Sequence, residues 1–172
     1  MSAVSPIIDD LSLPAGETPH GTTWELISDR VMGGVSDGAL TPTTLDGRPA
    51  LRMTGTVSLE NDGGFLQMAL DLRPDGRGVD ASSYTGLALD ILGNDQRYNL
   101  HLRTADVTRP WQSYRAAFIA PGQWTTLKLP FCDFTPHRLT APLDLSSLRR
   151  VGLVAIGRAF TADLALGDLR FY

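Results

Sequence analysis

Apolar and polar residues alternate with a period of two along much of this chain. In the clearest case, segment 51–60, polar residues separate a run of small or apolar ones: Leu51, Met53, Gly55, Val57 and Leu59. Successive side chains of a strand point to opposite faces of its sheet, so this spacing predicts a half-buried strand. Similar patterns predict further strands in segments 66–72, 87–91, 98–102, 114–118, 124–129 and 160–166. Helical periodicity is limited to a short turn within 143–150.

The segments between these strands are rich in glycine, proline, asparagine and aspartate, which favour turns. Short strands separated by turns are typical of an all-β antiparallel sandwich or barrel. We expect Ile7–Leu11 to pair with Leu166–Tyr172, which would protect one sheet edge and bring the termini together. The 172 residues, 42% of them hydrophobic, predict a single domain over 1–172, with a disordered tail at 1–6.

Two Gly-Gly pairs stand out from this background. Gly33-Gly34 lies in the segment Ser-Asp-Arg-Val-Met-Gly-Gly-Val-Ser at 28–36, and Gly63-Gly64 lies in Asn-Asp-Gly-Gly-Phe at 61–65. Both predict tight turns in which glycine adopts a positive φ. We expect the polar residues beside them to form a structural loop clamp, with Met32 and Phe65 packed beneath: Asp29, Arg30, Asn61 and Asp62. At the rim of a sheet, this clamp would also border a binding surface.

These motifs, preceded by Trp24, resemble the complex I intermediate-associated protein 30 family. Further motifs follow in the family's order: Tyr84-Thr85-Gly86-Leu87, Gly93 to Tyr98, Trp124, Pro130 to Phe134, and Val151-Gly152-Leu153. The likeness extends from about Ile7 to Tyr172, although Gly93-Asn94-Asp95 departs from the family's usual Gly-Asp-Gly turn. It implies a galactose-binding-like jelly roll, two stacked antiparallel sheets with one concave face. The mitochondrial proteins of this family are assembly factors for respiratory complex I (NADH:ubiquinone oxidoreductase).

Composition narrows the possible partners and location. The 15 basic and 19 acidic residues give a net charge of -4, and no basic run is present, which disfavours a nucleic-acid partner. No apolar run is long enough to span a bilayer, and no leader sequence is evident, so we expect a soluble cytoplasmic protein without a membrane span. The lone Cys132 fits a reducing compartment, and its apolar surroundings predict a buried structural thiol.

Catalytic and metal motifs are weak in this sequence. His20, His101 and His137 lack metal-ligand spacing, no Gly-x-Ser-x-Gly is present, and neither Gly-Gly pair matches a phosphate-binding loop. We therefore expect no catalytic residue, no metal and no cofactor. A structural calcium ion held by Asp9, Asp10 and Asp168 is the alternative to two solvated strand ends and a turn, and we favour the latter.

The central strands predict a polar face. With Tyr98, Leu100 and Leu102 directed inward, the residues between them point outward: Asn99, His101 and Arg103. Arg115 on the neighbouring strand would lie near Arg103, and adjacent arginines favour an anionic ligand or an acidic partner. The alternative is an ordinary solvated face in which Asp90 neutralises one arginine. Trp111 is expected to be exposed, and Trp124 to be packed.

Three functions remain open. The first is a non-catalytic domain that binds a protein partner, as the family resemblance implies. The second is binding of a carbohydrate or small molecule on the concave face, through Asn99, His101, Arg103, Trp111 and Arg115. The third is an enzyme with His101 as the general base and Arg103 or Arg115 stabilising an oxyanion.

Overall fold

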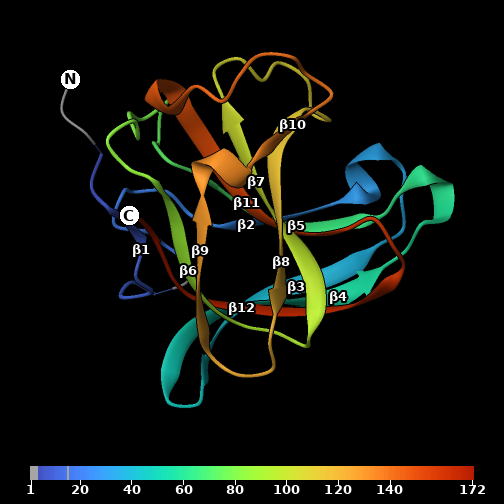
Figure 1. Ribbon diagram of the computed structural model, residues 1–172. Coiled ribbons are helices and arrows are strands. Elements are labelled where there is room, and N and C mark those ends of the chain that lie inside the picture. The colour runs from blue at the N-terminus through green and yellow to red at the C-terminus, as the bar shows by residue number, and fades with distance from the viewer. Residues whose placement is uncertain (1–3, 15) are drawn as a thin grey trace.

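The computed structural model describes residues 4–14 and 16–172, in which two antiparallel sheets pack face to face (Figure 1). Sheet 1 consists of β1 (Ile7–Asp9), β3 (Asp37–Leu45), β4 (Arg48–Val57), β6 (Gly86–Leu92), β9 (Thr125–Pro130) and β12 (Phe160–Phe171). Sheet 2 consists of β2 (Glu25–Ser28), β5 (Phe65–Asp71), β7 (Gln96–Thr104), β8 (Ser113–Ala120), β10 (Thr135–His137) and β11 (Leu148–Ile156). This arrangement confirms the predicted all-β sandwich.

The strand order shows which elements lie at the edges. Sheet 1 runs β3-β4-β12-β6-β9 with β1 also beside β12, and sheet 2 runs β10-β8-β7-β11-β5-β2. Four short 3-10 turns connect strands within the described residues: η1 (Asp29–Met32), η2 (Glu60–Asp62), η3 (Phe131–Asp133) and η4 (Leu145–Ser147). The last of these lies within the segment predicted as a helical turn.

The core lies between the two sheets and follows the predicted alternation. Leu51, Met53 and Val57 of β4 are buried, as are Tyr98 and the alternate residues that follow it in β7. The Tyr98 hydroxyl is satisfied inside this core, because it donates to Asn94 Oδ1 at 2.6 Å and accepts from the Asp163 amide at 2.9 Å. Burial of alternate apolar side chains on both sheets is the main favourable term in such a sandwich.

The two ends of the described chain meet at one edge, as predicted. β1 pairs antiparallel with β12, with Ile7 opposite Arg170, and Figure 1 shows β1 beside the C-terminus. Of the expected tail over 1–6, residues 1–3 lie outside the described residues. The Phe171 amide donates to the Pro6 carbonyl at 2.8 Å, and the Tyr84 hydroxyl donates to the Val4 carbonyl. Residues 4–6 are therefore attached to the sandwich rather than forming a free tail.

Two predictions about buried side chains are corrected. Cys132 is exposed, because the strand that precedes it ends at Pro130 and η3 directs Phe131 and Phe134 inward in its place. Trp124 is only half-buried: its indole NH donates to the Leu45 carbonyl at 3.1 Å, and the Arg48 guanidinium lies 4.8 Å from its ring centroid. Within residues 4–14 and 16–172, no helix has the length and apolar character needed to cross a membrane.

Candidate functional site

Asp29 is the centre of the predicted loop clamp. Its side chain is fully buried and accepts hydrogen bonds from the Ser36 amide at 2.9 Å, the Phe65 amide at 3.3 Å, the Ser36 hydroxyl and the Gly64 amide. Burial alone disfavours the ionised carboxyl, but these hydrogen bonds outweigh it and lower the pKa of Asp29. The buried carboxylate thus joins the loop that contains η1 to the loop that contains η2.

The two glycines of each pair have different roles. Gly33 and Gly64 adopt positive φ values of 88° and 132°, as predicted for the pairs. Gly34 and Gly63 instead make room for Asp29, since a Cβ atom on either would lie 2.4 or 2.5 Å from the Asp29 side chain. Each pair therefore contains one glycine required by the backbone and one required by the buried carboxylate.

The other predicted clamp residues behave differently. Arg30 reinforces the η1 loop, because its Nε donates to the Ser36 carbonyl at 3.0 Å. Asn61 and Asp62 adopt positive φ values and are exposed on η2, and among the described residues neither makes a side-chain hydrogen bond to the clamp. Met32 is 62% exposed, so its predicted place beneath the clamp is wrong. Asp29 fills that position, and η1 turns Met32 outward.

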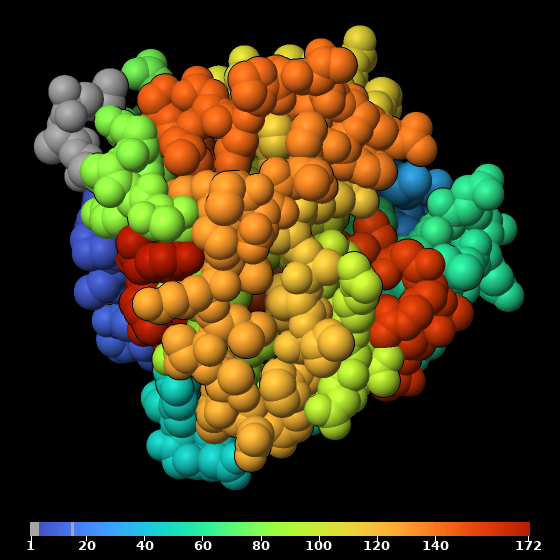
Figure 2. Space-filling model, in the orientation of Figure 1, coloured from blue at the N-terminus to red at the C-terminus, as the bar shows by residue number. Residues whose placement is uncertain are grey.

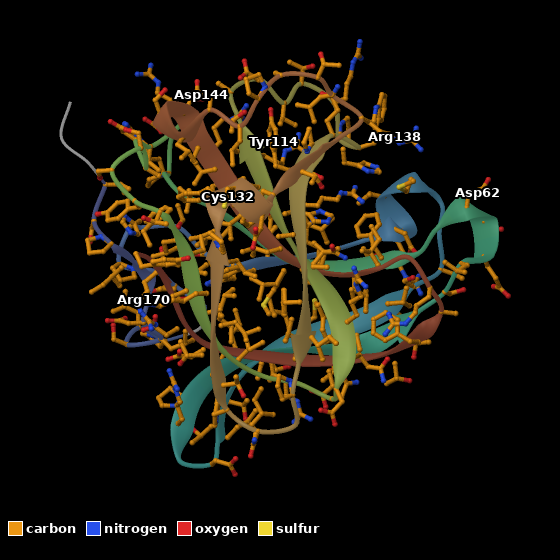
Figure 3. All side chains as sticks on the ribbon, viewed as in Figure 1. Asp62, Tyr114, Cys132, Arg138, Asp144 and Arg170 are labelled. Atoms are coloured by element: carbon orange, nitrogen blue, oxygen red, sulfur yellow. The ribbon has the colours of Figure 1, made fainter. Side chains whose placement is uncertain are left out.

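Together these two loops carry exposed apolar side chains, and we call this region the loop corner. It comprises four exposed side chains: Val31 (76% exposed), Met32, Val35 and Leu59 (51% exposed). Figure 2 shows the teal η2 loop projecting from the surface beside the blue η1 segment, and Figure 3 shows the Asp62 side chain on its outer side. The Asp29 hydrogen bonds to Gly64 and Phe65, at the start of β5, place this corner at the rim of sheet 2.

The predicted polar face is the outer face of sheet 2. His101 in β7 lies opposite Gly152 of β11 on one side and Arg115 of β8 on the other. Asn99 and Arg103 flank His101 on the same face of β7, and both are half-buried. The structure therefore brings four predicted residues together: Asn99, His101, Arg103 and Arg115.

His101 is held neutral in this environment. Its side chain is 9% exposed, and burial, followed by the charges of Arg115, His137 and Arg103, lowers its pKa to about 3. Its Nε2 atom is buried and has no hydrogen-bond partner among the described residues. Buried polar atoms are rarely left without a partner, so this nitrogen marks the face as a candidate site.

The two arginines of the face are not neutralised as the alternative prediction proposed. Asp90 lies in β6 of sheet 1, where it pairs with Arg48. Arg103 donates to the carbonyls of Arg109 and Pro110, and Arg115 donates to the Ser113 hydroxyl at 2.8 Å. Within residues 4–14 and 16–172, neither guanidinium forms an ion pair with a carboxylate.

The polar face extends toward two further features. At the Arg103 end, the loop that accepts its hydrogen bonds carries Trp111, which is 56% exposed, as predicted. At the Asn99 end, a hollow of about 440 Å³ is lined by Asp95, Gln96, Arg97, Asn99, Ile119, Ile156, Gly157 and Arg158. The charged and polar strip of β7 therefore connects an exposed aromatic ring with a surface hollow.

Of the acidic residues near the termini, Asp10 is exposed, as expected of a solvated strand end, whereas Asp9 and Asp168 differ from what was expected from the sequence. Asp9 is fully buried, and its carboxylate accepts from the Trp24 indole at 2.7 Å and the Leu11 amide at 2.9 Å. Burial raises the pKa of Asp9. Asp168 lies within β12 rather than in a turn and pairs with Arg170. In the described part of the chain, no three His, Cys, Asp or Glu residues are placed to hold a metal ion.

Several residues of these surfaces were not predicted from the sequence. Ser36 completes the clamp and lies in the same motif as Asp29, so its position in the motif was an available signal. No such signal marks Val31, Val35 and Leu59, because an apolar residue in a turn-rich segment is as consistent with a buried position in the core as with an exposed one.

Comparisons with known proteins agree with this fold. A family model described as complex I intermediate-associated protein 30 matches residues 15–167, and no curated protein matches the chain. The family 11 carbohydrate-binding module from Clostridium thermocellum, in complex with a β-1,3-1,4-mixed-linked tetrasaccharide, is 13% identical with a TM-score of 0.72. That similarity covers 99% of this chain and 96% of that chain.

Two other solved structures are similar over nearly all of this chain. A family 30 carbohydrate-binding module is 16% identical with a TM-score of 0.64, covering 99% of this chain and 84% of that chain. An exo-β-agarase is 12% identical with a TM-score of 0.60, covering 98% of this chain but 25% of that chain. Identities this low establish only the fold, a galactose-binding-like jelly roll, as the sequence predicted.

Proposed function

This chain belongs to the complex I intermediate-associated protein 30 family, and on that premise we propose that it is a non-catalytic protein-binding domain. Its partner is an assembly intermediate of the respiratory complex I type, bound through the loop corner. The observation that carries the proposal is the exposure of Val31, Met32, Val35 and Leu59 on loops that the buried Asp29 holds in place.

The chemistry of the loop corner fits a protein partner. Apolar side chains on a rigid support gain free energy when a partner covers them and lose little conformational entropy. Methionine adapts its shape to an opposing surface, which suits the outward position of Met32. The acidic Glu60 and Asp62 on η2 provide a polar rim, the usual surrounding of an apolar interface centre.

The state of His101 supports a non-catalytic role. An effective general base at neutral pH has a pKa near 7, whereas burial and neighbouring cations lower the pKa of His101 to about 3. An imidazole with so low a pKa is a weak proton acceptor, so the enzyme hypothesis has little chemical support on this face.

Affinity capture from the native host tests this proposal. We expect the wild-type protein to retain subunits of a complex I intermediate, and Met32→Asp to reduce their recovery about tenfold or more by placing a charge in the interface. The matched control is Leu13→Asp, which places the same charge on another exposed apolar side chain, 41% exposed, in the segment that follows β1 of sheet 1. Equal recovery by the wild type and Met32→Asp, or no recovery of complex I subunits by the wild type, would contradict the proposal.

Carbohydrate binding is the second candidate, favoured by the exposed Trp111 beside the polar face. An exposed indole stacks well against a sugar ring. A mixed-linkage β-glucan tetrasaccharide should then raise the melting temperature, and Trp111→Ala should abolish the rise. An unchanged melting temperature at millimolar tetrasaccharide would rule out this ligand.

A further inference from the structure

The polar face carries two arginines, Arg103 and Arg115, that form no ion pair within the part of the chain that the structure describes. Arg103 lies directly opposite Arg150 across the β7–β11 ladder, an arrangement that is unfavourable for like charges. Arg150 is compensated, because it pairs with Asp71 at 2.7 Å and Glu25 at 2.6 Å. Among the described residues, the acceptors of Arg103 are backbone carbonyls alone, so its charge remains available to a ligand.

Arg115, on the neighbouring strand β8, likewise has no carboxylate partner among the described residues. Its Nε is occupied by the Ser113 hydroxyl, and the nearby charge of Arg138 adds to its own. Burial is the largest cause that lowers the pKa of both arginines, followed by the charges of Arg150 and Arg149 at Arg103 and of Arg138 at Arg115, and Asp71 offsets the shift at Arg103 only in part. An anion placed here would compensate for the partial desolvation of both guanidinium groups and reduce the repulsion among the neighbouring cations.

His101 adds a second, independent indication of a ligand. Its Nε2 is buried and has no partner among the described residues; His101 lies two residues before Arg103 on β7 and directly opposite Arg115 on β8, and Gly152 on its other side contributes no side chain. A Cβ at Gly152 would lie 2.1 Å from the Gln67 carboxamide oxygen, so a polar side chain already covers that position. A ligand oxygen that accepts from a neutral imidazole and from guanidinium groups would complete this set of donors.

The same residues distinguish the class of ligand. Guanidinium groups match the planar fork of a carboxylate, to which they donate paired hydrogen bonds. A neutral sugar chain requires aromatic platforms, and the side chains of β7 and β8 around His101 are asparagine, arginine, serine and alanine. An acidic ligand therefore fits this face better than a neutral one.

We propose that the outer face of sheet 2 binds a carboxylate at Arg103, His101 and Arg115, presented by an acidic segment of a protein partner. The choice of a protein segment rests on the proposed function, whereas the carboxylate site rests on the geometry of the face. The face and the loop corner lie on the same sheet, the latter at its β2–β5 edge, so one partner can contact both.

Direct binding of a fluorescent ten-residue glutamate peptide to the full chain tests this site. Arg103→Gln and Arg115→Gln should each weaken binding about tenfold or more, the effect of losing one charge-assisted hydrogen bond. The matched control is Arg97→Gln, which removes one exposed charge from the same face of β7 and should change the affinity less than about twofold. Arg115→Lys should retain part of the affinity, because the charge remains.

A measurement on the wild-type protein tests the site even if one of the variants fails to fold. The imidazole nitrogen resonances of His101 should shift on saturation with the peptide, while those of the distant His20 stay unchanged. Absence of peptide binding, an unchanged His101 resonance, or equal weakening by Arg97→Gln and Arg115→Gln would overturn the site. Tighter binding of oligogalacturonate than of the glutamate peptide would overturn the protein segment as its ligand. Because capture is tested with Met32→Asp, failure of the capture experiment would remove the reason to choose a protein segment but leave the carboxylate site standing, and failure of the peptide experiment would leave the loop corner standing.

Discussion

At the residue scale, the buried Asp29 explains why glycines occur in pairs. The two loops must approach one carboxylate closely enough for their backbone amides to donate to it, and only glycine leaves space at both points of approach. The side chain and its neighbouring backbone are thus one structural unit, in which the cost of burying a charge is offset by directed hydrogen bonds.

This interpretation predicts different costs for neighbouring alanine substitutions. Gly33→Ala meets no atom within 4 Å and places alanine at a φ of 88°, so it should cost about 1 to 2 kcal/mol. Gly34→Ala would bring a Cβ to 2.4 Å from Asp29 and should cost about 3 kcal/mol or more. Urea unfolding of both variants measures the difference, and a larger loss for Gly33→Ala would contradict the role assigned to Gly34.

His101 makes stability depend on pH in a direction that follows from its lowered pKa. The side chain has an ordinary pKa of 6.5 in the unfolded chain and a pKa of about 3 in the fold. Between these values the unfolded state binds the extra proton, so stability is lost as the pH falls through this window. From pH 7 to 4.5 the loss from this group should be roughly 2 to 3 kcal/mol.

Unfolding experiments at both pH values distinguish the contribution of His101 to the pH dependence of stability from the contributions of other groups. His101→Gln should lose less stability on acidification than the wild type, because the titrating imidazole is gone. His137→Gln serves as the control, since His137 is only half-buried and its lowered pKa has a smaller cost. Identical acid sensitivity in the wild type and His101→Gln would show that His101 is not held neutral by the fold.

At the element scale, β1 illustrates how a three-residue strand stabilises a larger sheet. It covers part of β12 and inserts Ile8, which is completely buried, while Ile7 on the opposite side of the strand is 43% exposed. Pairing of this short segment also supports the buried contact between Asp9 and Trp24. The strand therefore contributes core as well as edge protection.

The two isoleucines provide a matched pair of variants. Ile8→Ala should lower the free energy of unfolding by roughly 2 to 4 kcal/mol through lost burial and an internal cavity. Ile7→Ala should lower it by less than about 1 kcal/mol, because most of its side chain already contacts water. Thermal or urea unfolding decides between them, and equal effects would mean that β1 does not hold the register described.

The elements also show which strands a sequence reveals. Strands with one buried and one polar face, such as β4 and β7, were predicted because their side chains alternate. β11 lies between two strands and is buried over Val151–Ala155 on both faces, so no alternation marked it. β3 lies at an edge and contains Pro42, and its mostly exposed side chains gave no apolar signal. Alternation is visible in a sequence only where one face of a strand is apolar and the other is polar. The two faces of β11 and of β3 differ little in this respect.

At the scale of the whole molecule, the sequence predicted the sandwich and the polar face but not the electrostatics of that face. Pairing of β7 with β8 followed from neighbouring alternating segments, which predicted Arg115 near Arg103, and the structure places Arg115 directly opposite His101. The location of Asp90 in the other sheet depends on the order of strands, which alternation cannot specify. Exposure of Met32 and Cys132 likewise depends on the course of short 3-10 turns.

The exposure of Cys132 provides a practical way to monitor ligand binding at the polar face. It is the one cysteine in the sequence and lies on η3, three residues before Thr135, which pairs with Arg115. A thiol-reactive dye would attach at this native position alone and report the arrival of a ligand as a change in emission. The protein thus carries its own attachment point for an optical binding assay.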